Sequence, residues 1–345
     1  MRAPNVRVVL AGLAVAVLVV GDSIATRLGG GTDGGGDVPR TTSAVDGAPA
    51  PTTSLSGLGS LADRLARLPA VAPGELAGVL YLAGCPPATL DLNTLETARP
   101  PGEVCAAPGA RFGVRLSDLQ MSDRELPIVD LNGGPAETVR APDGWDFVDL
   151  ARQGVVFCRD ADRLEGRLRR FGGGTTRLPS CPLARTRAGL MLYPGGDKRS
   201  VIDERGRRVA ALARPVQAGV SGVREFGDGL LAVDHELYRD GRRIASYGEG
   251  SVALAASRDG KVALLRGPDR SDQRLLVYHH GELHAIDDEL VQGGAGVVAP
   301  DGRRILLQYD RTTMIEIDPA TRRPLALLKT ADFVADWRPA VVEPA

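Results

Sequence analysis

The sequence has no excess of positive charge. Its 42 lysine and arginine residues are balanced by 43 aspartate and glutamate residues, and the pI is near 6.5. Binding to nucleic acid depends on basic residues that neutralise phosphates. The charge balance therefore excludes a nucleic-acid partner.

Motifs for catalysis are also absent. The sequence has no G-x-S-x-G elbow, no S-x-x-K pair and no H-E-x-x-H helix. The Gly-Gly-Gly runs that begin at Gly29, Gly34 and Gly172 lack the Lys-Ser/Thr of a phosphate loop. We therefore name no catalytic residue and expect no cofactor.

The N-terminal apolar run is too short for an ordinary membrane-spanning helix. It covers residues 8–21, follows Arg2 and Arg7, and falls short of the roughly 20 residues that a bilayer requires. It has the length of a signal-peptide core, and Ser-Ile-Ala at residues 23–25 would serve as a cleavage site. Residues 1–27 are thus predicted to be a signal anchor or a signal peptide, and both place the rest of the chain outside the cytoplasm.

A spacer follows this run. Residues 28–57 are rich in Gly, Ser, Thr and Pro and have little apolar surface to bury, so we expect a disordered linker. As a flexible coil it would reach roughly 30 Å, enough to lift a domain off a membrane. A spacer suits a tethered protein, so we favour an uncleaved anchor. The alternative is secretion after cleavage near Ala25.

The rest of the chain is rich in turn formers and contains a repeat. With 43 Gly and 24 Pro, the composition favours many short strands. A hairpin pattern recurs at spacings of 38, 40, 33, 36, 40 and 38 residues. Its seven copies align at Leu90, Ile128, Leu168, Val201, Leu237, Val277 and Ile315.

Each copy follows an apolar strand without polar alternation, as expected of a strand covered on both faces. Asp259-Gly260 and Asp301-Gly302 join two of these strands to the strand before, and we predict two-residue hairpins there. The seven apolar strands begin at Gly78, Phe112, Gly154, Gly189, Gly229, Lys261 and Arg304.

A four-stranded antiparallel unit that repeats at close to 40 residues is typical of a β-propeller blade. We predict an all-β propeller of seven blades over residues 74–340, with six blades as the alternative. The first unit lacks its first strand, and residues 332–339 form a first strand with no blade behind them. The C-terminal strand should therefore close the ring, with Trp337 packed at the seam.

On these residues the chain resembles the TolB-like and WD-type propellers, in which "PDG" recurs between the first two strands of a blade. The match is full at Pro300-Asp301-Gly302 and partial at Arg258-Asp259-Gly260. The resemblance covers residues 76–339, and it implies the fold and an exported, bacterial-type protein without indicating an activity. Before the ring, residues 58–73 are predicted to form a short amphipathic helix that packs on it.

Four cysteines bracket two of the hairpins. Cys85 and Cys105 flank the first hairpin, and Cys158 and Cys181 flank the third in the same way. We predict two disulfides, Cys85–Cys105 and Cys158–Cys181, each worth about 3 kcal/mol in the chain-entropy model. Their wide, unrelated spacings argue against a metal site.

Three other clusters have simple interpretations. His279, His280 and His284 lie in one hairpin, whose strands would hold His279 and His284 at different depths, so we expect no metal there. The acidic residues 287–289 lack the ligand spacing of a calcium loop. The basic patch of the third hairpin should be a solvated strand edge, with an anionic partner as the alternative. It consists of Arg163, Arg167, Arg169 and Arg170.

The leading functional hypothesis is a membrane-tethered extracytoplasmic β-propeller that binds a protein or a cell-envelope polymer at one face of the ring. The alternative is an extracytoplasmic hydrolase or lyase with a site at the ring axis. A cluster of His, Asp, Glu or Arg at the axis would favour the enzyme. A purely structural spacer would have an axis without such a cluster.

Overall fold

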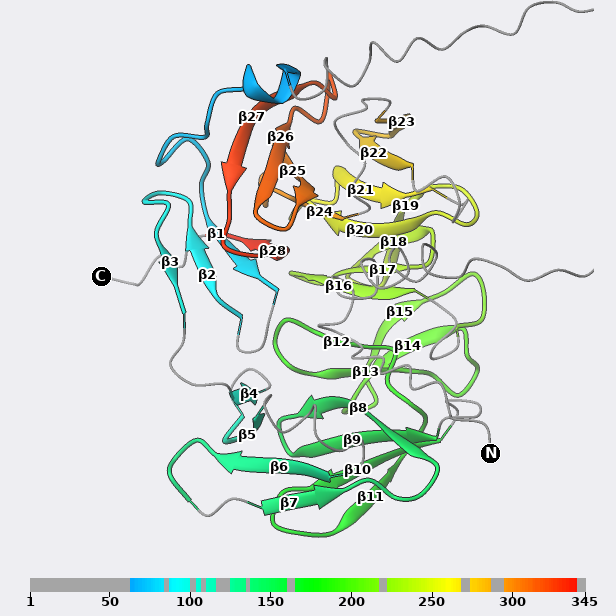
Figure 1. The fold of residues 1–345 in the computed structure, drawn as a ribbon. Helices are drawn as coiled ribbons and strands as arrows, with labels where there is room; N and C mark the ends of the chain where they lie inside the picture. Colours follow the sequence, from blue (N-terminus) through cyan, green and yellow to red (C-terminus); the bar gives the residue numbers. More distant parts are fainter. Residues whose placement is uncertain are drawn as a thin grey trace, which may run out of the picture.

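The computed structural model describes ten stretches of the chain, and within them seven four-stranded antiparallel sheets follow one another around a ring (Figure 1). The sheets are the predicted blades, and we number them 1 to 7 from the N-terminus. The chain is thus a seven-bladed β-propeller, which settles the choice between six and seven blades. The described stretches are residues 63–83, 87–99, 104–106, 110–115, 125–134, 137–159, 165–216, 222–267, 274–286 and 295–339.

Each blade runs from an inner strand at the ring axis to an outer strand. The blades consist, from the inner strand outward, of β28 (Val334–Arg338), β1 (Val79–Leu82), β2 (Thr89–Asp91) and β3 (Thr97–Ala98) in blade 1; β4 (Val104–Ala106), β5 (Phe112–Arg115), β6 (Glu125–Asp130) and β7 (Glu137–Arg140) in blade 2; β8 (Trp145–Ala151), β9 (Gly154–Arg159), β10 (Gly166–Arg170) and β11 (Thr175–Leu178) in blade 3; β12 (Ala184–Arg185), β13 (Met191–Pro194), β14 (Ser200–Asp203) and β15 (Arg208–Ala211) in blade 4; β16 (Val223–Gly227), β17 (Leu230–Val233), β18 (Glu236–Arg239) and β19 (Arg242–Ser246) in blade 5; β20 (Val252–Ala256), β21 (Val262–Arg266), β22 (Leu275–His279) and β23 (Glu282–Ala285) in blade 6; and β24 (Gly296–Val298), β25 (Ile305–Asp310), β26 (Thr313–Ile317) and β27 (Pro324–Lys329) in blade 7.

The seven aligned repeat positions all lie on third strands and are all buried, from Val201 at 0% exposed to Leu168 at 8%. In six blades the aligned residue lies opposite an apolar residue of the second strand, as in the pairs Leu80 with Leu90 and Leu264 with Val277. These side chains form cores between neighbouring blades, so each sheet buries both faces. The repeat in the sequence therefore reflects a repeat of packing.

The C-terminal strand closes the ring, as predicted. Strand β28 pairs with β1 and supplies the inner strand that the first unit lacks. Trp337 lies opposite Leu80, is 3% exposed, and donates its Nε1 hydrogen to the Ala77 carbonyl at 3.0 Å. Gly78 has a φ of 112°, and a Cβ there would lie 2.4 Å from the Arg338 carbonyl oxygen. The seam therefore requires glycine at this position.

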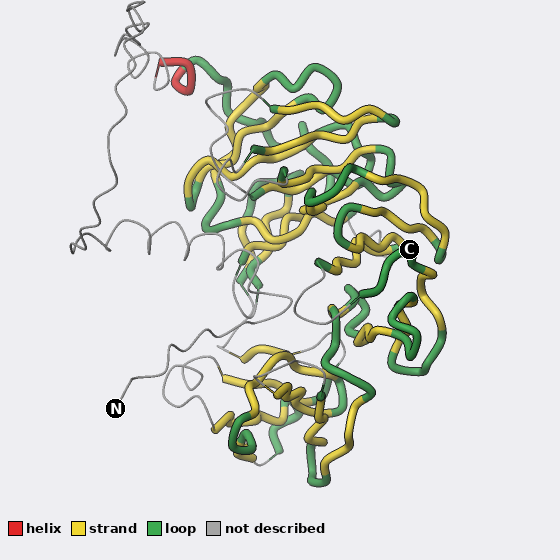
Figure 2. The backbone as a smooth tube through the Cα atoms, turned by 90° about the vertical axis from the view of Figure 1, so that its right-hand side faces the viewer, coloured by secondary structure: helices red, strands yellow, loops and turns green. Residues whose placement is uncertain are grey.

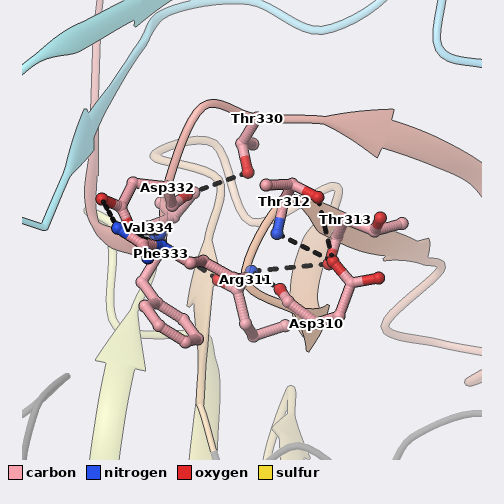
Figure 3. Close-up of polar contacts among 9 residues, drawn as sticks. Asp310, Arg311, Thr312, Thr313, Thr330, Asp332, Phe333 and Val334 are labelled. Carbon is pink, nitrogen blue, oxygen red and sulfur yellow. Dashed lines mark hydrogen bonds and ion pairs between the residues drawn. The ribbon is translucent and has the colours of Figure 1, made fainter.

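A set of polar contacts holds the start of the closing strand against blade 7 (Figure 3). Arg311, after β25, reaches both carboxylate oxygens of Asp332, at 3.0 and 3.1 Å. Asp332 also accepts a hydrogen bond from the Phe333 amide at 2.9 Å, and Gln308 accepts one from the Val334 amide at 3.1 Å. These contacts set the direction in which the chain enters β28.

The turns at the two Asp-Gly sites are longer than predicted. Residues 257–261 separate β20 from β21, and of these only Gly260 has a positive φ, at 70°. The prediction of two-residue hairpins is therefore wrong there. Ser257 explains the difference, because its hydroxyl contacts Asp259 at 2.7 Å and the Val262 amide at 3.0 Å, which stabilises a wider turn. A two-residue hairpin occurs instead at Asp228-Gly229, where both φ values are positive.

The segment before β1 covers the outer edge of blade 7. Residues 63–66 form a helical turn, drawn red in Figure 2, and Leu65 and Leu68 pack against the core between blades 6 and 7. The Val71 amide then donates to the Leu327 carbonyl at 2.9 Å, and Leu327 donates to Pro69 at 2.8 Å. This contact protects the edge of β27.

No helix in the described part of the chain is long and apolar enough to cross a membrane. The apolar run 8–21 and the spacer 28–57 lie outside that part. The boundaries 1–27, 28–57 and 58–73 stay predictions.

Candidate functional site

The third hairpin is held by the predicted disulfide. Cys158 on β9 and Cys181 after β11 are bonded, with Cα atoms 5.7 Å apart. Both residues are buried in the core that blades 3 to 5 share. Cys105 is buried on β4, and Cys85 lies outside the described residues, so the pair Cys85–Cys105 stays a prediction.

The histidines of blade 6 lie along one hairpin. His280 and Gly281 form its turn, with φ values of 50° and 103°. The rings of His279 and His280 are 4.6 Å apart, and His284 lies 3.2 Å from Glu282. In the described stretches, no three His, Cys, Asp or Glu side chains gather closely enough to hold a metal ion. The acidic residues 287–289 lie outside these stretches.

The basic patch of blade 3 follows the alternation of β10. Arg167 is exposed and lies over the Trp145 ring, 4.2 Å from its centroid, whereas Leu168 is buried. Arg170 donates to the Thr176 hydroxyl at 3.1 Å. These arginines contact their own blade, and Arg163 lies outside the described residues.

Charged side chains do gather at the ring axis. Arg185 on β12 contacts Asp149 on β8 at 2.9 Å and donates to the Leu150 carbonyl at 3.0 Å. The two side chains are 13% and 12% exposed. Burial raises the pKa of Asp149 to about 6, although the Arg185 charge acts in the opposite direction. This pair joins the inner strands of blades 3 and 4.

A second ion pair crosses the axis. Arg187, in the turn after β12, lies 2.5 Å from Asp336 on β28. Blades 4 and 1 are not neighbours in the ring, so this contact spans its centre. The other Asp336 oxygen contacts Arg338 at 2.7 Å, and the Arg187 amide donates to Glu225 on β16 at 2.8 Å. We call Asp149, Arg185, Arg187, Glu225 and Asp336 the axial cluster.

The repeat of the second and third strands does not reveal the axial cluster, whose residues lie on or next to inner strands. A signal was present in the inner strands. In three blades the third residue from the end of the inner strand is acidic: Asp149, Glu225 and Asp336. In blade 6 the same position holds Leu254. Aligning inner strands by their last residues would have shown three acidic residues at one level of the ring.

Two open clefts of about 370 and 380 Å³ lie side by side on blades 5 to 7. They lie on what we call the turn face, which carries the turns between first and second strands and between third and fourth strands. Asp259 and Asp301 line both clefts. The remaining lining residues are Lys261, Val262, His279, His280, Gly302, Arg303, Arg304, Asp318, Pro319 and Ala320 in the first cleft, and Asp228, Arg239, Arg258 and Pro300 in the second.

The turns around the clefts are held by their own hydrogen bonds. The Asp259 carboxylate accepts from the Lys261 amide at 3.0 Å, and Asp301 accepts from the Arg303 amide at 2.9 Å. The Arg258 amide also donates to the Pro300 carbonyl at 2.8 Å, which ties the turn of blade 6 to that of blade 7. The clefts thus combine hydrogen-bonded turns with exposed charged side chains.

Comparisons with known proteins concern the fold alone. No protein-family model and no curated protein matches the chain. Among solved structures, the dihydro-heme d1 dehydrogenase NirN in complex with DHE is 13% identical, covers 79% of this chain and 67% of its own, and has a TM-score of 0.44. KlHsv2 with loop 6CD replaced by a Gly-Ser linker is 11% identical, with 71% and 90% covered and a TM-score of 0.35. The β-propeller domain of Cps50 (Swd1) from Myceliophteria thermophila is 13% identical, with 67% and 92% covered and a TM-score of 0.37. At these identities and scores the matches say nothing about what the chain binds.

Proposed function

We propose that this chain is a β-propeller binding module that its N-terminal segment holds at the outer side of a cell membrane. Its partner, a protein or a cell-envelope polymer, binds the turn face of blades 5 to 7. The observation that carries this proposal is the pair of adjoining clefts, which share Asp259 and Asp301.

The exposed ion pairs around the clefts stabilise the fold little, so their charges are available to a partner. Arg258 and Asp228 are 2.6 Å apart, and their side chains are 65% and 55% exposed. Arg303 and Asp301 are 3.8 Å apart and exposed to 83% and 60%. Exposed pairs of this kind contribute about 0 to 1 kcal/mol, so they can re-pair with a partner at little cost. Because both signs are present, a partner of mixed charge fits better than a polyanion.

The setting outside the cytoplasm is supported by three features. Arg2 and Arg7 precede the apolar run 8–21, the spacer 28–57 follows it, and a disulfide joins Cys158 to Cys181. The likeness of Pro300-Asp301-Gly302 to the TolB-like propellers agrees with an exported protein of bacterial type.

The partner site is tested by charge reversal. The chain with Asp259→Lys and Asp301→Lys is crosslinked at the cell surface beside the wild type, with Glu249→Lys as a matched control. Glu249 is 74% exposed, pairs with Arg214, and lies after β19 at the opposite face. We expect the double variant to lose the wild-type crosslink and the control to keep it. Equal crosslinking by all three chains would refute the turn face as the site.

The tether is tested by fractionation of the native host. The proposal expects the full-length chain in the membrane fraction, with blades 1 to 7 open to protease added outside. A soluble chain that starts near Thr26 would show secretion instead.

Because of the axial cluster, an enzyme is the second candidate function. Asp149, with a pKa raised to about 6, has the ionisation that an acid or base catalyst needs. If the axis is a hydrolase or lyase site, Asp149→Asn should abolish an activity that Asp259→Lys leaves intact. A module that only binds would show no such activity in either chain.

A further inference from the structure

Three arginines of blade 3 lie around a single carboxylate. Arg159 at the end of β9 and Arg177 on β11 lie 3.5 and 3.6 Å from Glu165, farther than the roughly 3.2 Å of a good hydrogen bond. Arg167 lies on β10, between these two strands, and has no ion-pair partner in the described part of the chain. We call Arg159, Arg167 and Arg177 the arginine cluster. Among the described residues, its three positive charges share one negative charge.

The strand register puts the arginine cluster on one face of the sheet. Arg167 lies directly opposite Arg177 on β11 and opposite Phe157 on β9. Arg159 is two residues beyond Phe157, so its side chain projects from the same face. Like charges that lie opposite each other on a sheet destabilise it. The side chains of Arg159 and Arg177 are 56% and 82% exposed, so the cluster is open to solvent.

Arginines that support the fold are paired differently. Arg111 lies 2.6 Å from Asp130, and Arg207 lies 2.8 Å from Asp203. Both of these aspartates are buried, so each arginine balances a charge that water cannot reach. Glu165 is 36% exposed and does not need an arginine in this way. Support of the fold therefore explains Arg111 and Arg207, but it does not explain the arginine cluster.

The guanidinium of Arg167 has a defined place on this surface. It lies over the Trp145 ring, 4.2 Å from the ring centroid, and Trp145 is half-buried at the start of β8. Next to Arg159, the disulfide between Cys158 and Cys181 holds the hairpin. A guanidinium that stacks on an aromatic ring keeps the hydrogens along its edge for acceptors. The stack therefore offers a flat surface with hydrogen-bond donors around it.

We propose that the arginine cluster binds an acidic polysaccharide. The guanidinium forks match the carboxylates of such a polymer, and the flat stack of Arg167 on Trp145 suits a sugar ring, whereas the acidic side chains of a peptide carry no ring. A carboxylate of the polymer competes with Glu165 for Arg159 and Arg177. Because Arg159 ends β9 and Trp145 begins β8, the site lies toward the face opposite the turn face. It goes beyond the proposed turn-face function and does not depend on the tether.

The ligand class is tested by isothermal titration of the full chain, in a neutral detergent, with polygalacturonate at low ionic strength. Fully methyl-esterified polygalacturonate has the same sugars without the charges and is the matched control. We expect binding to polygalacturonate that weakens as salt is added, and no binding to the ester. Polyglutamate, which has carboxylates without sugar rings, should bind about fivefold more weakly. Polyglutamate that binds as tightly as polygalacturonate would overturn the polysaccharide in favour of an acidic protein, and the absence of binding to either would overturn the site.

Two variants locate the binding on the arginine cluster. Arg167→Gln/Arg177→Gln should weaken the binding of polygalacturonate by about tenfold, whereas its fold is kept because it removes two like charges that lie opposite each other. Glu165→Gln should tighten binding by about threefold, because it removes the carboxylate that competes with the polymer.

The control for these variants is Arg170→Gln/Arg208→Gln. It removes the same number of charges, but Arg170 alternates with Arg167 to the other face of β10, where it contacts Thr176, and Arg208 lies on β15 in blade 4. The affinity of this control for polygalacturonate should stay within about twofold of the wild type. A control that binds as weakly as Arg167→Gln/Arg177→Gln would overturn the site, and so would weaker binding by Glu165→Gln.

Discussion

Arg187 and Asp336 form an ion pair that joins blade 4 to blade 1 across the ring axis, although 149 residues separate them in the chain. Each side chain is about one quarter exposed, at 27% and 23%. Asp336 belongs to β28, the strand that closes the ring. The pair therefore ties the closing strand to blade 4, in addition to its pairing within blade 1.

Removing this pair should loosen the ring measurably. Arg187→Gln is expected to lower the free energy of unfolding by about 1 kcal/mol, and Asp336→Asn by more, because Asp336 also holds Arg338. Urea unfolding of both variants and of the double variant gives the coupling energy. Arg214→Gln is the control, because its pair with Glu249 is exposed to 63% and 74% and should be worth less. If Arg187→Gln costs no more than Arg214→Gln, the pair across the axis does not stabilise the ring.

The disulfide of blade 3 should be a main source of stability. Replacing both Cys158 and Cys181 by Ala is expected to lower the free energy of unfolding by about 3 kcal/mol, because the bond closes a loop with a sequence separation of 23 residues. Denaturant unfolding of the oxidised wild type and the double variant measures the loss. The matching double variant of Cys85 and Cys105 tests the predicted second bond. Equal midpoints for the wild type and Cys158→Ala/Cys181→Ala would contradict the prediction.

Asp149 should make stability fall as the pH rises from about 4 to about 6. Burial raises its pKa in the folded chain from 3.8 to about 6, whereas in the unfolded chain the pKa stays near the ordinary value. The folded state therefore binds the proton more tightly, and the stability that this gives below pH 4 is lost as the pH rises through 6. Because Asp149→Asn cannot ionise, the stability of the wild type relative to this variant should decrease across that window and level off above pH 7.

Denaturant unfolding at pH 4, 5, 6 and 7 checks this trend. Asp203→Asn is the control. Burial acts against ionisation of Asp203, but hydrogen bonds from Arg207 and Arg205 hold its pKa below 3.8. The stability of the wild type relative to this variant should change only below pH 4. If the stability of the wild type relative to Asp149→Asn stays constant or grows as the pH rises, the pKa of Asp149 is not raised in the folded chain.

The sequence predicted those parts of the fold that repeat. The second strand β9 is buried on both faces and the third strand β10 on one, so Val156 and Leu168 are both apolar, and the same pattern repeats along the chain. The closing strand was predictable because Trp337 sits in a strand-like segment that follows the seventh copy of the repeat, whereas the first copy lacks its inner strand. Both inferences rest on local patterns of burial.

The axial cluster was not predictable in this way. Inner strands are short, as β12 is, or carry bulges, as β8 does between Phe147 and Asp149 and β16 does between Glu225 and Gly227. The alternation of buried and exposed side chains along the inner strands is therefore irregular. The pairing of Arg187 with Asp336 depends on the position of two blades in the closed ring, which no local pattern contains.

Strands β1 and β28, from opposite ends of the propeller sequence, pair in one blade, and hydrogen exchange followed by mass spectrometry measures this pairing. The closed ring predicts that the amides of β1 and β28 exchange slowly, like those of β25 in the next blade. Trp337→Ala should then speed exchange in both strands together, while β13 and β17 stay protected. Fast exchange of β28 in the wild type, at the rate of an unpaired tail, would contradict the closed seven-bladed ring.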